Sequence, residues 1–96
     1  MEEWRPVRGY AGWYEVSDQG RVFSLARHAT RGGLLAPQLN SAGYRFVRLH
    51  RYGRVRSVTV GSLVLEAFSW PPPFAHARAR HRAGKLDDGL MNLYWG

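Results

Sequence analysis

Residues 43–60, GYRFVRLHRYGRVRSVTV, combine aromatic and β-branched residues with regularly spaced arginines. These residues flank Tyr52-Gly53 on both sides, and the pattern predicts a β-hairpin closed by a two-residue turn. Such a turn sets Val47 opposite Val58. One face is then apolar and is the predicted core face, formed by Val47, Leu49, Val58 and Val60. The opposite face carries Phe46, Arg48, His50, Ser57 and Thr59.

The hairpin runs directly into GSLVLEAF, residues 61–68, which predicts a short helix with Gly61 or Ser62 near its N-cap. Pro71-Pro72-Pro73 ends this helix and predicts an extended connector behind it. The helix residues expected to pack on the hairpin share one face and are Leu63, Val64, Ala67 and Phe68.

Shorter elements are expected on both sides of this unit. Asp18-Gln19-Gly20 has the composition of a tight turn, and Gly20 suits a position with positive φ. Gly32-Gly33 and Pro37 interrupt any regular structure near them. The expected elements are strands at residues 13–17 and 21–24, a loop at 31–40, an alternating stretch at 76–82 and a short helix at 88–93.

The composition bounds the class of protein. The 96 residues carry a formal net charge of +7, contain no cysteine and are 45% hydrophobic. This length suits one domain, and the hydrophobic content excludes a disordered tail. The lack of cysteine excludes disulfide scaffolds and Cys-ligated zinc modules. Because no apolar run approaches the roughly 20 residues that cross a bilayer, and no signal segment is evident, we expect a soluble, cytoplasmic protein.

The positive charge is unevenly distributed along the chain. Arginine supplies 13 of the 14 Lys and Arg residues, and five arginines lie in residues 43–60 without any acidic residue. Arginine binds phosphate or guanine through two parallel hydrogen bonds, and a two-stranded ribbon fits the DNA major groove. The alternatives are a solvated sheet face whose charges oppose edge pairing, and an arginine surplus set by GC-rich codons. The candidate DNA-binding residues are Arg45, Arg48, His50, Arg51, Arg54, Arg56, Arg78, Arg80 and Arg82.

The segment WRPVRGYAGWYEVSDQGRVFSL, residues 4–25, closely resembles the nuclease-associated modular DNA-binding (NUMOD-type) motif of phage HNH homing endonucleases. The tail HRAGKLDDGLMNLYW, residues 81–95, resembles the HNH half-site that ends in Asn-Leu. This resemblance implies one α+β domain over residues 1–96, with a small antiparallel sheet and short helices. Within it, residues 1–42 would form the NUMOD-type β motif and residues 43–96 an HNH-like ββα-metal region. Double-stranded DNA is the implied partner, and a phage or prophage is the implied source.

The same resemblance implies a chemistry for the tail. In such enzymes a divalent cation, Mg²⁺ or a similar ion, binds the scissile phosphate while a histidine deprotonates the attacking water. His81 falls at the position of this general base and Asn92 at the position of the final asparagine. Asp87 and Asp88 could join Asn92 as oxygen ligands of the metal, but either aspartate also suits a helix N-cap.

Three features depart from the family pattern. Gly61-Ser62 replace a usual His-Arg pair, Arg80 replaces the acid before the histidine, and Ala83-Gly84 replace an Asp-Gly-Asn loop. An arginine beside a Mg²⁺ site repels the ion. We therefore expect a DNA-binding protein with lost or impaired cleavage, which needs no cofactor. The alternatives are an active Mg²⁺-dependent endonuclease that uses His81, and a phage protein that binds a host protein. Recognition of a long DNA site would require a homodimer or another partner.

Overall fold

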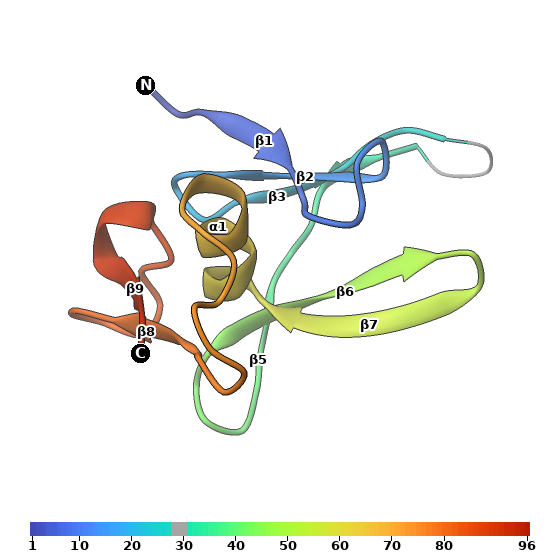
Figure 1. Ribbon diagram of the computed structural model, residues 1–96. Helices are drawn as coiled ribbons and strands as arrows, with labels where there is room; N and C mark the ends of the chain where they lie inside the picture. Colours follow the sequence, from blue (N-terminus) through green and yellow to red (C-terminus); the bar gives the residue numbers. More distant parts are fainter. Residues whose placement is uncertain (28–30) are drawn as a thin grey trace.

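The computed structural model describes residues 1–27 and 31–96, in which antiparallel strands surround one α-helix (Figure 1). The first sheet joins, in order, β1 (Trp4–Pro6), β2 (Tyr14–Ser17), β3 (Val22–Ser24) and β4 (Gly33–Leu34). The second sheet joins β5 (Gln38–Leu39), β6 (Arg45–Arg51) and β7 (Arg54–Thr59). The helix α1 (Val60–Phe68) follows β7 directly. Near the C-terminus, β8 (Ala79–His81) pairs with β9 (Leu93–Trp95), and the 3₁₀ turn η1 (Leu90–Asn92) precedes β9.

Strands β6 and β7 form the predicted hairpin in the predicted register, with Val47 opposite Val58. Tyr52 and Gly53 close the turn with φ of 52° and 73°, the positive values that a type I′ turn requires. Val47 is buried on the core face, whereas Arg48, the next residue along β6, is exposed on the other face. The alternation of the sequence therefore determines which side of the hairpin joins the core.

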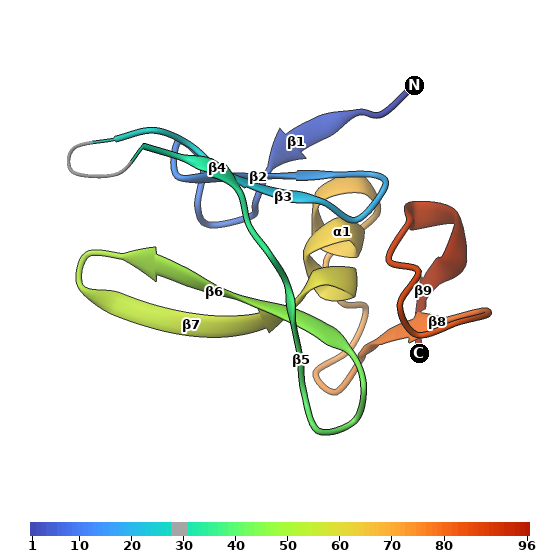
Figure 2. The same ribbon diagram turned by 180° about the vertical axis from the view of Figure 1, so that it is seen from behind.

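Helix α1 occupies the centre of the molecule, between the first sheet, the hairpin and the β8–β9 pair (Figures 1 and 2). Leu63 and Val64 are buried as predicted, and Ala67 and Phe68 pack partly buried against the core. The buried core takes residues from both sides of position 42, so the two segments of the chain share one apolar interior. Its members are Val7, Tyr14, Val16, Val22, Val47, Leu49, Val60, Leu63, Val64, Leu65 and Leu93.

The turn between β2 and β3 contacts the segment before β9. The Leu90 amide donates a hydrogen bond of 2.7 Å to the Asp18 carbonyl oxygen. Gly20 has φ of 85°, and a Cβ atom there would lie 2.9 Å from the Asp88 backbone. Glycine is therefore required at this position both for its conformation and for the close approach of a second segment.

Three expectations need correction. Residues 31–40 are not only a loop, because β4 and β5 each add a two-residue strand to a sheet edge. The helix expected at 88–93 is only the single 3₁₀ turn η1, because its last residues extend into β9 and pair with β8. Helix α1 begins one residue earlier than expected and its N-cap is Thr59. No helix among the described residues has the length and apolar character needed to span a membrane.

Candidate nucleic-acid interface

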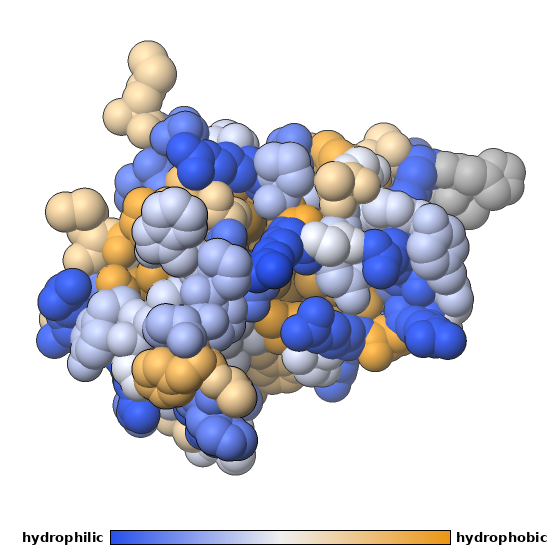
Figure 3. Space-filling view, in the orientation of Figure 1, coloured by the Kyte–Doolittle hydropathy of each residue, from blue (hydrophilic) through white to orange (hydrophobic). Residues whose placement is uncertain are grey.

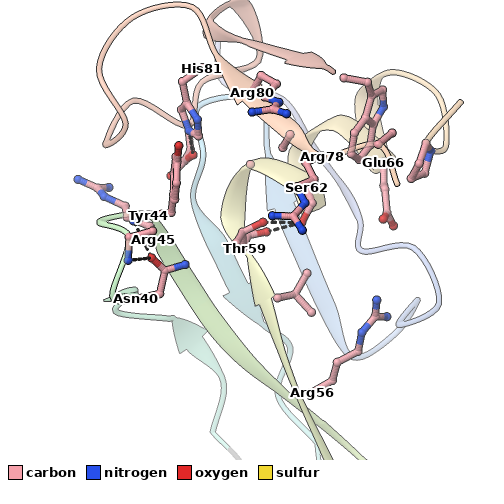
Figure 4. Close-up of a pocket in the computed structure, with 18 residues that line it drawn as sticks. Asn40, Tyr44, Arg45, Arg56, Thr59, Ser62, Glu66, Arg78, Arg80 and His81 are labelled. Carbon is pink, nitrogen blue, oxygen red and sulfur yellow. Dashed lines mark hydrogen bonds and ion pairs between the residues drawn. The ribbon is translucent and has the colours of Figure 1, made fainter. Parts of the chain in front are cut away.

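A pocket of about 460 Å³ opens between the first turn of α1, the start of β6 and the outer side of β8 (Figure 4). Four of the nine candidate DNA-binding residues line it, although they come from separate parts of the chain. These residues are Arg45 on β6, Arg56 on β7, Arg78 just before β8 and Arg80 on β8. Antiparallel pairing of short strands thus gathers charges that are up to 35 positions apart in sequence.

The turn before β6 builds one side of the pocket. The Asn40 side-chain oxygen accepts hydrogen bonds of 3.0 Å from the amides of Ala42 and Tyr44. Gly43 completes this turn with φ of 87°. The turn orients the Tyr44 ring, which stacks on the His81 ring with 5.3 Å between centroids and 29° between planes.

The start of α1 builds the opposite side. The Ser62 hydroxyl donates a hydrogen bond of 2.8 Å to the Thr59 carbonyl oxygen and lies 2.8 Å from the Thr59 hydroxyl. Thr59, Gly61 and Ser62 all line the pocket. The amides of a helix's first turn have no partners within the helix, and the helix dipole favours a negative charge at that end. This wall of the pocket is therefore suited to an anion.

The floor of the pocket is a buried pair formed by His81 and Asp88. The Nε2 atom of His81 lies 2.7 Å from Oδ1 of Asp88, and the two side chains are only 7% and 3% exposed. Gly61 leaves room for this pair, because a Cβ atom there would lie 3.3 Å from Oδ1 of Asp88. The Nδ1 atom of His81 and the Oδ2 atom of Asp88 are buried without any hydrogen-bond partner in the described structure. A ligand that enters the pocket could supply a partner for the free His81 nitrogen.

The arginines of the pocket differ from those near the first sheet in whether they form ion pairs with carboxylates. Arg21 donates hydrogen bonds to the Glu2 carboxylate, and this contact lowers the pKa of Glu2 from 4.5 to about 2. Arg5 pairs with Glu3. By contrast, in residues 1–27 and 31–96 no carboxylate forms an ion pair with any of the nine candidate DNA-binding residues. Their charge is therefore available to an external anion.

Five candidate residues lie outside the pocket. Arg48 and His50 are on the other face of the hairpin, and Arg51 and Arg54 face each other at its tip. Arg82 follows β8, and its guanidinium carbon lies 5.0 Å from the centre of the Tyr94 ring. Strongly hydrophilic side chains cover much of the hairpin in Figure 3. The basic surface is thus larger than the pocket and divides between the two faces of the hairpin.

The three residues suggested as metal ligands do not all meet at one place, because Asp87 and Asn92 line a hollow together with Asp18 whereas Asp88 lies in the arginine pocket. The Asp88 carboxylate points inward to His81, while Oδ1 of the exposed Asp87 accepts a hydrogen bond from the Gly89 amide. Asn92 donates both of its side-chain N–H groups, to the carbonyl oxygens of Gly84 and Asp87, and its Oδ1 accepts a hydrogen bond from the Ala83 amide.

Within the described ranges, no group of three or more His, Cys, Asp or Glu side chains could hold a metal ion. Mg²⁺ binds through several oxygen ligands in nearly octahedral geometry. Of the suggested ligands, Asp88 is already bonded to His81, and Arg80 adds a positive charge to the same pocket, which opposes a cation there.

Sequence reasoning did not identify Tyr44 or Ser62 as parts of this pocket, nor Asp88 as the partner of His81. The one sequence signal for Tyr44 is its position directly before Arg45, a candidate DNA-binding residue. The pairing of Asp88 with His81 depends on how β8 and β9 meet, and that contact leaves no local pattern in the sequence.

Comparison with known proteins agrees with this architecture. The chain is 34% identical to the DNA endonuclease I-HmuI of Bacillus phage SP01 over 95 residues, which cover 97% of this chain and 51% of the relative. It also matches a solved structure described as DNA binding and cleavage by the HNH homing endonuclease I-HmuI. That match has a TM-score of 0.82 at 28% identity and covers 98% of this chain and 52% of the other. The chain therefore spans about half the length of these relatives. Residues 2–50 match the model of the NUMOD4 motif, and the chain belongs to the NUMOD4 motif family.

Proposed function

We propose that this chain is a double-stranded DNA-binding protein of the HNH endonuclease class with lost or impaired cleavage. The observation that carries the proposal is a set of four arginines around the first turn of α1, none of which forms an ion pair with an Asp or Glu side chain in the described residues. A backbone phosphate in this pocket would meet guanidinium groups and the unpaired helix amides. These groups donate hydrogen bonds. Two carboxylates, Glu66 and Asp88, also line the pocket, and Asp88 is already bonded to His81.

The arrangement of the tail supports the loss of cleavage. Asp88 holds His81 inside the protein, and Asn92 holds the loop at residues 83–87. In this proposal Arg80 supplies positive charge to the phosphate where related enzymes use a cation, and His81 in its imidazolium form donates a hydrogen bond from Nδ1 to the phosphate. No divalent cation is then needed for binding.

The proposal treats residues 1–96 as one working unit. The shared core and the contact of the Asp18 carbonyl with the Leu90 amide support a NUMOD-type part at 1–42 that braces an HNH-like ββα part at 43–96. The likeness to a phage protein supports a phage or prophage protein acting in the cytoplasm of its host. Recognition of a long site would draw on a second copy of the chain or a host protein.

A second candidate function is retained because of the geometry of His81. If Asp88 accepts the Nε2 proton, Nδ1 carries the free lone pair and is the nitrogen able to accept a proton from water. A carboxylate that fixes a histidine tautomer in this way is a common arrangement for a general base. An active Mg²⁺-dependent nicking enzyme would use this group, and a cleavage assay separates it from the first candidate.

DNA binding is tested by titrating a labelled duplex with the wild-type protein and with Arg56→Ala and Arg80→Ala over a range of salt concentrations. Each variant should bind about 10- to 100-fold more weakly, because a hydrogen bond to a charged group contributes about 1.5–3 kcal/mol. Each should also lower the slope of log K against log salt by about 0.9, since one fewer counterion is released.

Arg21→Ala is the matched control, because it removes the same single charge from an arginine already paired with Glu2. It should leave the affinity and the salt slope close to wild type. An affinity that does not depend on the salt concentration, or an equal loss of affinity in all three variants, would count against the pocket as a phosphate site.

A further inference from the structure

A second hollow, of about 510 Å³, lies where the tip of the β6–β7 hairpin meets the loop before β2. It shares no residue with the arginine pocket. Among the residues that the structure describes, its lining combines aromatic rings with cationic side chains and includes no carboxylate. The lining residues are Gly12, Trp13, Arg27, His50, Arg51, Tyr52 and Gly53.

Tyr52 holds an unusual position in this hollow. It is the first of the two central residues of a type I′ turn, a position where φ must be positive and asparagine or glycine is preferred. Tyrosine adopts φ of 52° there at a conformational cost, yet its side chain is 79% exposed and so gains little from burial. A strained residue that displays a large ring to solvent points to a role in binding.

The surroundings fix the orientation of this ring. Trp13 meets Tyr52 edge to face, with 5.2 Å between centroids and 71° between planes. The Arg51 guanidinium carbon lies 5.4 Å from the Tyr52 ring centre and 4.6 Å from that of Tyr10, and it donates a hydrogen bond to the Gly9 carbonyl oxygen. These contacts hold the Tyr52 ring from its edge and from one side, and most of the ring surface stays accessible.

Arg27 limits what the hollow can accept. Its guanidinium lies 4.8 Å from the Trp13 ring centre and donates hydrogen bonds to the carbonyl oxygens of Trp13 and Leu25. Because Arg27 and Arg51 already occupy aromatic faces, the cluster is not a cage for a cationic ligand. An electron-rich or anionic planar group, stacked on Tyr52 with its phosphate near Arg51 and Arg54, suits the charges present.

We propose that Tyr52 is a stacking platform for an unpaired DNA base, such as a bulged or single-stranded nucleotide beside the duplex held by the arginine pocket. Base stacking on an aromatic ring is largely independent of sequence, and Arg51 and Arg54 would hold the flanking phosphates. This inference rests on the proposed DNA binding, but it concerns a different surface and a different form of DNA.

The test compares three probes, which are an intact duplex, the same duplex with one unpaired thymine, and an oligothymidine. The main variant is Tyr52→Asn, since asparagine favours the turn and should maintain or raise the melting temperature. Tyr52→Phe keeps the ring, and Phe74→Asn removes a different exposed aromatic ring as the matched control. We expect Tyr52→Asn to weaken binding of the bulged duplex and of the oligothymidine about tenfold, with the intact duplex unchanged. Both other variants should bind like the wild type.

A second readout does not depend on a variant that folds. With 2-aminopurine at the unpaired position, its fluorescence should fall when the wild-type protein binds, because stacking on an aromatic ring quenches it. Equal affinity of the wild type for intact and bulged duplexes without quenching would overturn the inference and leave the proposed function standing. Failure of the wild-type protein to bind the intact duplex would instead count against the proposed function itself.

Discussion

The Asp88 carboxylate lies inside the protein with the His81 ring as its hydrogen-bond partner. A carboxylate removed from water is stable only when it is paired, and the pair in turn fixes the orientation of the histidine. Gly61 allows this arrangement, because any side chain there would press against the carboxylate. At the scale of single residues, the tail is thus built around an internal hydrogen-bonded pair, while the arginines remain at the surface.

Removal of this internal carboxylate should destabilise the folded protein. We expect Asp88→Ala to lower the free energy of unfolding by about 3–5 kcal/mol, because it leaves a buried imidazole without a partner. The neighbouring Asp87→Ala is the control, since Asp87 is exposed and bonds only the Gly89 amide; its cost should be about 1 kcal/mol. Urea denaturation of both variants measures the difference. Equal destabilisation by the two substitutions would contradict the role assigned to Asp88.

At the scale of elements, the β2–β3 turn and the segment before β9 brace each other. The Leu90 amide bonds the Asp18 carbonyl oxygen, and the turn glycine, Gly20, lies against the Asp88 backbone. The contact joins the part of the chain that matches the NUMOD4 motif to the segment that carries His81 and Asp88. We infer that this brace keeps the floor of the pocket in place.

Two glycines allow the brace to be tested. Gly20 and Gly9 have nearly the same φ, 85° and 81°, but a Cβ atom would clash with Asp88 at position 20 and would meet nothing within 4 Å at position 9. Gly9→Ala should therefore report the conformational cost alone, about 1–2 kcal/mol. Gly20→Ala should cost about 1–3 kcal/mol more, because the two segments must separate. Thermal unfolding of both variants gives the comparison, and identical melting temperatures would refute the brace.

The elements also differ in how far the sequence predicts them. The register of the β6–β7 hairpin follows from its turn and its alternation, which are both local, and the structure confirms it. The register of β8 with β9 depends instead on a contact between segments separated by a loop. The helix that the sequence predicts at residues 88–93 therefore wrongly includes Leu93, the first residue of β9. The gathering of Arg45, Arg56 and Arg80 around one pocket has the same non-local origin. Their residue type indicated nucleic acid, but only the fold brings them together.

At the scale of the whole molecule, the net charge of +7 divides into two populations. Arginines of the first sheet, such as Arg5 and Arg21, pair with nearby glutamates and stabilise the protein surface. Those on the hairpin and near β8 form no ion pairs with Asp or Glu in the described parts of the chain, and four of them line a pocket at a helix N-terminus. The charge that favours binding of DNA also opposes binding of a divalent cation near His81.

The central claim, that this protein holds DNA without cutting it, is tested most directly on a supercoiled plasmid. The plasmid is incubated with the wild-type protein in Mg²⁺, in Mn²⁺ and in EDTA, and binding is followed in parallel by the shift of the plasmid on a gel. We predict a salt-sensitive shift in all three conditions, with the plasmid still supercoiled after the protein is removed. Nicked or linear DNA that forms with metal, disappears with EDTA and is lost in His81→Ala would contradict the account.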